Sequence, residues 1–126
     1  MSTPNDTAGK GAHYEMRAGQ FLCQKGHRVI TTNFRCKLGE IDLITQDPQG
    51  YLVFVEVRYR ASNRFGGALA SISAKKQTRL RRAAETFLAI HPSYQQQRCR
   101  FDVIAMGESD AGQNGQKINW IKSAFY

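Results

Sequence analysis

Two acidic residues interrupt two short apolar runs, at a spacing that could support metal-dependent chemistry. Asp42 lies in the run 41–45 and Glu56 lies in the run 51–59, and both runs are rich in β-branched and aromatic residues. The Asp-Pro-Gln-Gly segment 47–50 separates them. This segment is typical of a type I turn closed by a glycine in the left-handed conformation. The sequence therefore predicts a β-hairpin whose register is fixed by its turn.

The predicted register brings the two acids face to face. Counting back from the turn, Asp42 lies opposite Glu56 and Glu40 lies opposite Arg58, all on one face because side chains alternate along a strand. Opposed Cβ atoms are about 5 Å apart, and like charges at that distance destabilise a strand pair. Apolar residues fill both faces of the hairpin, so we expect both to be covered. Buried carboxylates this close share a proton or hold a hard cation such as Mg2+. The alternative is a solvated acidic edge.

Composition and charge limit the classes of protein to which the chain can belong. The 126 residues suit one domain, predicted over residues 10–126 after a disordered N-terminus at 1–9. A net charge of +8 favours a polyanionic partner such as nucleic acid over an anionic membrane surface. No apolar run is long enough for a signal peptide or a membrane span, so a cytoplasmic location without a membrane partner is expected. The 3 cysteines are widely spaced and indicate neither a disulfide framework nor a zinc site.

The first predicted helix covers residues 12–25 and ends at Gly26, a residue suited to the left-handed position after a helix. Its expected buried stripe consists of Tyr14, Ala18, Phe21 and Leu22. Glu15 borders this stripe. From its position alone, Glu15 is either a solvated edge residue or, if the helix packs near the hairpin, a third acid of the site.

The remaining elements follow from apolar periodicity and capping residues. A strand is predicted at 27–34, before the hairpin. A second helix is predicted at 74–90, with Ser73 as N-cap and a stripe that begins at Leu80 and faces a sheet. Strands are expected at 100–106 and 117–122, the latter at a sheet edge. Asp102, inside the first of these strands, is predicted to be a structural hydrogen-bond acceptor.

A basic stretch follows the hairpin. Residues 57–84 contain eight lysines and arginines and no acid. The residues predicted to contact the phosphates of a nucleic acid are Arg60, Arg64, Lys75, Lys76, Arg79 and Arg82. Lys75 and Lys76 oppose the macrodipole at the amino end of the second helix, and an anion bound there would offset this effect. A merely solvated basic face is the alternative.

The predicted element order is α-β-β-β-α-β, which fits an α/β fold with a mixed central sheet flanked by helices. Several motifs carry a family resemblance: Gly11-x-x-x-Glu15-x-x-Ala18, Asn33-Phe34-Arg35-Cys36, residues 39–44 and 54–58, Phe65-Gly66, residues 75–84 and 100–104, and Trp120-Ile121-Lys122. With these motifs the chain resembles the YraN family of small bacterial proteins over residues 11–125. That family is similar to the restriction-endonuclease-like superfamily, which includes archaeal Holliday junction resolvases.

The superfamily resemblance implies a catalytic site. In the superfamily, an acid from the first helix, an aspartate on one hairpin strand and a Glu-x-Lys on the next surround Mg2+ and cut a phosphodiester. Glu15, Asp42, Glu56 and Arg58 occupy the matching positions. The resemblance therefore implies that these four residues are catalytic, that the three acids bind Mg2+ or Mn2+, and that the substrate is nucleic acid, DNA in the first place. Junction-cleaving relatives commonly act as dimers, which leaves a homodimer open here.

Arg58 departs from the superfamily pattern, which has lysine at this position. An arginine grips phosphate through two donors and cannot lose a proton, which excludes a mechanism with a neutral amine as base. Opposite Glu40, Arg58 could also form a cross-strand ion pair and nothing more. Three functions therefore stay open: a metal-dependent endonuclease, a non-catalytic nucleic-acid-binding module with a degenerate active site, and an adaptor for an acidic protein or an anionic membrane.

Overall fold

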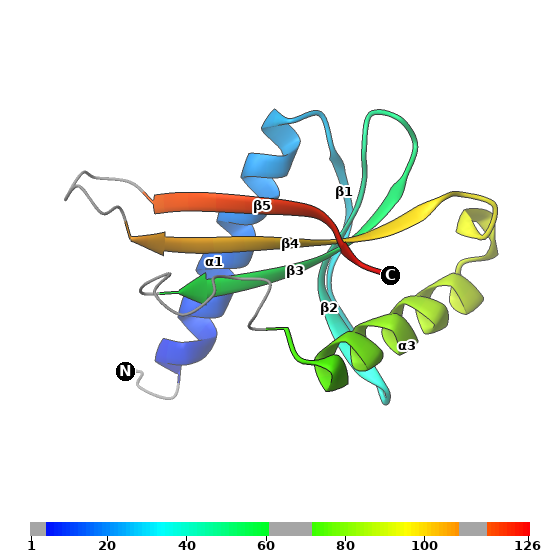
Figure 1. The fold of residues 1–126 in the computed structure, drawn as a ribbon, viewed down its shortest axis with the longest axis horizontal. Coiled ribbons are helices and arrows are strands. Elements are labelled where there is room, and N and C mark those ends of the chain that lie inside the picture. The colour runs from blue at the N-terminus through cyan, green and yellow to red at the C-terminus, as the bar shows by residue number, and fades with distance from the viewer. Residues whose placement is uncertain (1–4, 61–71, 109–115) are drawn as a thin grey trace.

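In the computed structural model of the chain, residues 5–60, 72–108 and 116–126 are described. The elements follow the predicted α-β-β-β-α-β order, and the chain closes with the further strand predicted at 117–122 (Figure 1). Their bounds are α1 Asn5–Gln24, β1 Arg28–Cys36, β2 Gly39–Gln46, β3 Leu52–Arg60, α3 Ala74–Ile90, the short 3-10 helix η1 Pro92–Tyr94, β4 Cys99–Glu108 and β5 Gln116–Phe125. The predicted fold class is therefore confirmed.

The five strands form one mixed sheet in the order β1-β2-β3-β4-β5. The pairing of β3 with β4 is parallel, and the other three pairings are antiparallel. A parallel pair needs a long crossover between its strands, and α3 lies in the crossover here. β5 lies at an edge of the sheet, as predicted.

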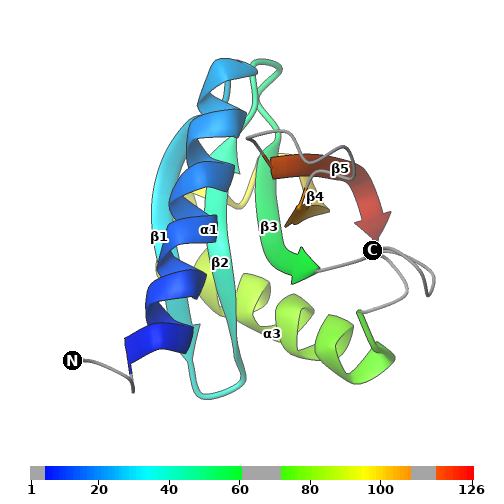
Figure 2. The same cartoon turned by 90° about the vertical axis from the view of Figure 1, so that its left-hand side faces the viewer.

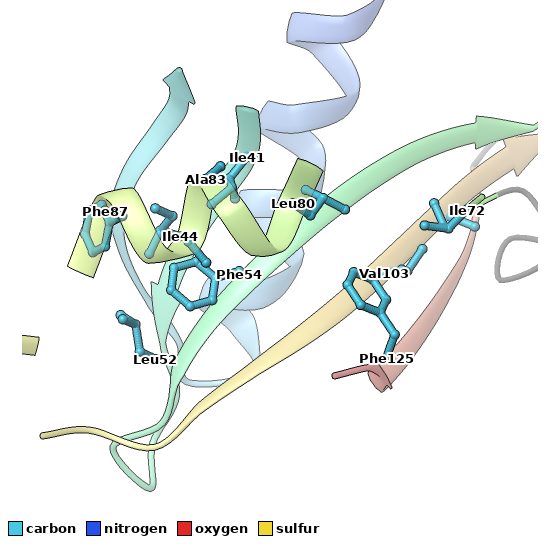
Figure 3. Close-up of a cluster of buried hydrophobic side chains, with 12 residues drawn as sticks. Ile41, Ile44, Leu52, Phe54, Ile72, Leu80, Ala83, Phe87, Val103 and Phe125 are labelled. Carbon is cyan, nitrogen blue, oxygen red and sulfur yellow. The ribbon is translucent and has the colours of Figure 1, made fainter. Parts of the chain in front are cut away.

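The two long helices cover opposite faces of the sheet, α1 on one and α3 on the other (Figures 1 and 2). Under α1, the buried Ala18 and Leu22 pack with apolar residues of the central strands. Under α3, Leu80 and Phe87 pack on Phe54 and the larger cluster that Figure 3 shows. Both predicted helix stripes are confirmed. No helix in the described ranges is both long and apolar enough to cross a membrane.

The hairpin turn has the predicted geometry. The Asp47 amide donates to the Tyr51 carbonyl at 3.0 Å, and the Gly50 amide donates to the Asp47 carbonyl at 3.0 Å. Gly50 has φ +93°, the left-handed conformation that the turn requires. From this turn the register runs through Gln46–Leu52 and continues to Leu43–Val55. The register predicted from the turn residues is therefore confirmed over these pairs.

The helix ends follow the capping signals, with one correction. α3 has the predicted bounds, and the Ser73 hydroxyl accepts a hydrogen bond from the Lys76 amide at 3.0 Å. α1 ends before Gly26, whose φ is +91° and whose added Cβ would meet the Pro48 ring at 2.7 Å. At its other end α1 begins at Asn5, earlier than the predicted start at residue 12.

Asp102 joins β4 to β5 and is completely buried. Its carboxylate accepts hydrogen bonds from Arg100 Nε at 3.0 Å, Trp120 Nε1 at 2.9 Å and the Ser123 amide at 3.0 Å. These donors satisfy the carboxylate where the β4–β5 register shifts, between Phe101 and Val103. Asp102 is the structural acceptor that the sequence predicts.

Candidate metal and nucleic-acid site

The site begins where β2 and β3 separate. Their ladder ends at Leu43–Val55. At the next hydrogen-bonded position, the Val57 amide donates instead to Asp42 Oδ2 at 2.8 Å. The Asp42 side chain thus takes the place of a backbone carbonyl at the opening between the two strands.

The side-chain alternation of β2 breaks at the same point. Ile41 and Ile44 both pack in the cluster under α3, whereas Leu43 packs under α1. Strict alternation would place Ile41 and Leu43 on the same face. Asp42 therefore lies at a local twist of the strand, from which its carboxylate reaches side chains on both faces of the sheet.

Asn33 on β1 lies beside this twist and has a rare backbone conformation. The ladder pairs Thr32 with Leu43 and Phe34 with Ile41, which places Asn33 next to Asp42 on the neighbouring strand. Asn33 has φ +53°, a left-handed conformation that asparagine adopts more readily than most residues. Such residues inside a strand mark local strain, which is commonest at functional sites.

Three carboxyl groups meet at the opening. Asp42 forms side-chain hydrogen bonds with Glu15 from α1 and with Glu56 from β3. Glu56 is only 4% exposed, although it is an ionisable residue. The three acids predicted as metal ligands are therefore neighbours, with Asp42 in the middle, and we call them the carboxylate cluster.

Burial raises the pKa of each acid in the cluster, and the charge of Asp42 raises the pKa of the two glutamates further. Burial and then the charge of Asp42 raise the pKa of Glu56 to about 7, while Lys76 and Arg58 oppose this shift. Burial and Asp42 likewise raise the pKa of Glu15 to about 7. Burial also raises the pKa of Asp42, opposed by its hydrogen bonds with the Val57 amide and Glu56. Near neutral pH the cluster therefore holds protons that ordinary carboxylates release.

Two cations contact the buried acid. Lys76 Nζ lies 3.5 Å and Arg58 Nη1 lies 3.4 Å from Glu56 Oε2. The β2–β3 ladder does not extend to Glu40 and Arg58, which the predicted register places opposite each other, and Arg58 contacts Glu56. Lys76, which is also a predicted phosphate contact, reaches the carboxylate cluster from the first turn of α3.

The carboxylate cluster can supply some, but not all, of the ligands of a hard divalent cation. In the described ranges, no three His, Cys, Asp or Glu side chains are arranged to hold one metal ion together. Mg2+ in proteins usually takes only one or two carboxylates, and water and substrate phosphates complete its coordination. Asp42 and Glu56 match this smaller set, with Glu15 adjacent. A cation there would also neutralise the repulsion that now holds protons on the cluster.

The predicted phosphate contacts fall into two groups. Lys75, Arg79 and Arg82 are exposed on α3, and together with Lys76 we call them the basic face. Arg60 ends β3, and Arg64 lies outside the described residues. Since Lys76 contacts Glu56, the amino end of this basic face lies directly at the carboxylate cluster.

Two features of the site were not predicted from the sequence. One is the left-handed Asn33, whose side chain hydrogen-bonds Glu15. The signal was a residue with low strand propensity inside an otherwise regular strand. The other is the contact between Lys76 and Glu56, for which spacing along the chain gives no signal because the residues lie on different elements.

Comparison with known proteins identifies the family. The family model described as "Uncharacterised protein family UPF0102" matches residues 14–106. A UPF0102 protein of Ralstonia nicotianae is 48% identical over 98% of this chain and 91% of its own length. Relatives from Alcanivorax borkumensis and Pseudomonas entomophila are 47% and 46% identical over 92% and 94% of this chain, and over 90% and 92% of their own lengths. The chain therefore belongs to the UPF0102 family, the YraN family that its motifs predict.

Proposed function

We propose that this protein binds DNA and cleaves phosphodiester bonds with a divalent cation held at the carboxylate cluster. The observation that carries the proposal is the contact of Lys76 with Glu56, at 3.5 Å. It joins a buried acidic cluster to the basic face of α3. A phosphate bound along that face would lie beside the carboxylates, where its own negative charge requires a cation between them.

The chain supplies the groups that phosphodiester hydrolysis needs. A bound Mg2+ or Mn2+ supplies an activated water and charge neutralisation at the phosphate. Asp42 and Glu56 would hold the cation, with Glu15 hydrogen-bonded to Asp42 beside them. Arg58 binds phosphate oxygens through its planar guanidinium. Lys76 provides the single mobile ammonium that the superfamily places at the position of Arg58.

The proposal is tested with purified protein and branched, flapped and single-stranded DNA. We expect cleavage in Mg2+ or Mn2+ and none in EDTA. We also expect affinity that falls steeply as salt rises, because cations on α3 displace counterions from phosphates. Absence of cleavage in both metal ions, or binding with a flat salt response, would contradict the proposal.

The alternative is a DNA-binding module without catalysis, favoured by Arg58 in place of the superfamily lysine. It predicts the same steep salt dependence. It differs in one outcome, since it predicts no cleavage of any of these substrates in either metal ion.

Lys76 and Lys75 form a matched pair that separates catalysis from binding. Lys76→Gln should lower the cleavage rate by about a hundredfold, the order expected for loss of an electrostatic group at a reacting phosphate. Lys75→Gln should weaken binding modestly and leave single-turnover cleavage nearly unchanged, because Lys75 is exposed. Single-turnover rates at saturating protein measure the difference. Equal rates for the two variants would assign Lys76 to phosphate binding alone.

A further inference from the structure

A groove of about 350 Å³ opens between α1 and β1, next to the carboxylate cluster. Ala12, Met16 and Gly19 line it from α1, at a spacing that places them on one helix face. Val29 and Leu43 line it from the sheet. Figure 2 shows α1 lying across β1 and β2, the strands that form this wall. Ala12 and Gly19 are small residues, which leaves space between this helix face and the strands.

One end of the groove is polar and belongs also to the cluster. Glu15 lines the groove and hydrogen-bonds Asp42. Thr32 and Asn33 are consecutive residues of β1, yet both line the groove. The left-handed conformation of Asn33 accounts for this, because alternation would send one of them to the other face. The left-handed conformation thus brings the side-chain amide of Asn33, which has both donors and an acceptor, to the groove beside Glu15.

We propose that this groove receives an unpaired nucleobase from the strand that is cleaved. The inference rests on the proposed function and names its substrate class, DNA with unpaired nucleotides. Apolar walls with a few polar groups at one end suit a flat base, whose faces are apolar and whose edges carry donors and acceptors. Glu15 belongs to both the groove and the carboxylate cluster. A base in the groove and a phosphate at the cluster can therefore belong to the same nucleotide or to adjacent ones.

The experiment compares three DNA ligands by fluorescence anisotropy in Ca2+, at short times that give no cleavage: a paired duplex, the duplex with a single-stranded flap, and the same flap built from abasic residues. The abasic flap keeps every phosphate and lacks the bases. We expect the unaltered protein to bind the intact flap at least about fivefold more tightly than the abasic flap, the lower end of what base stacking contributes.

A groove-filling variant makes the test specific. A Cβ at Gly19 would meet only Val29 Cγ2, at 3.9 Å, so the first side-chain atom fits, and the remaining atoms of Gly19→Leu should occupy the groove that Gly19 lines. It should abolish the preference for the intact flap and leave affinity for the duplex and the abasic flap unchanged. Gln20→Leu is the matched control, because Gln20 is the exposed neighbour on the same helix. It should keep the preference.

The outcomes separate the groove from the proposed function. DNA binding without a preference for the intact flap contradicts base binding in the groove and is still compatible with the proposed function. A preference that survives Gly19→Leu, or that Gln20→Leu also removes, overturns the groove as well. A change of oligomeric state on Gly19→Leu would assign the groove to a second copy of the chain. Absence of DNA binding removes both proposals. The abasic comparison needs no variant, so poor folding of Gly19→Leu does not leave the groove untested.

Discussion

Asp42→Asn should lower the metal-dependent cleavage rate by at least about a hundredfold while the fold stays intact. Asparagine keeps the size of the side chain and an oxygen that accepts the Val57 amide, now bonded to Asp42 at 2.8 Å. It removes the negative charge at the centre of the carboxylate cluster, on which cation binding and charge stabilisation depend. Single-turnover cleavage measures the loss, and thermal unfolding checks the fold.

Glu40→Gln is the matched control for Asp42→Asn. Glu40 lies on the same strand, but its side chain is exposed. We expect its cleavage rate to stay within a few-fold of that of the unaltered protein. Equal losses in the two variants would show that general negative charge on β2 matters, and that Asp42 has no special role.

Glu56→Gln should stabilise the protein at alkaline pH, although it removes a group of the site. The pKa of Glu56 is about 7 in the folded chain, against an ordinary value of 4.5 for a solvated glutamate. Between pH 4.5 and about pH 7 the folded state binds more protons than the unfolded state. The free energy of unfolding therefore falls as the pH rises through this range. The loss is complete above pH 7 and amounts to about 3 kcal/mol for such a shift. Glutamine cannot ionise, so the variant should regain up to about that amount.

Urea unfolding at pH 4.5 and pH 8.5 measures this effect. The gain from Glu56→Gln should be largest at pH 8.5 and small at pH 4.5. Glu85→Gln on α3 is the control, because Glu85 is exposed, and it should show no comparable pH dependence. Destabilisation by Glu56→Gln at pH 8.5 would mean that Glu56 is a structural anchor for Lys76 and Arg58. A gain would instead agree with the usual conflict between active-site chemistry and stability.

Local sequence signals were sufficient for much of the fold. The hairpin register follows from the turn, because Pro48 and Gly50 favour one turn geometry and each later pair follows by counting. The bounds of α3 follow from Ser73 at one end and Pro92 beyond the other. In each case the deciding interaction spans only a few residues.

The features that could not be predicted depend on contacts between distant segments. The opening between β2 and β3 requires Asp42 to capture the Val57 amide, and simple counting would continue the ladder. Lys76 reaches Glu56 only because α3 returns across the sheet after β3. The start of α1 at Asn5 was missed because residues 1–9 carry no apolar periodicity.

Calorimetric titration of Mn2+ into the protein at pH 7 tests the metal site most directly. We expect one binding event with release of protons, because Glu15 and Glu56, with pKa values of about 7, must give up protons when a cation binds. Proton release is read from the dependence of the heat on the ionisation enthalpy of the buffer. Asp42→Asn should abolish both the binding and the release. No binding to the unaltered protein, or binding that Asp42→Asn leaves unchanged, would contradict a metal site at the carboxylate cluster.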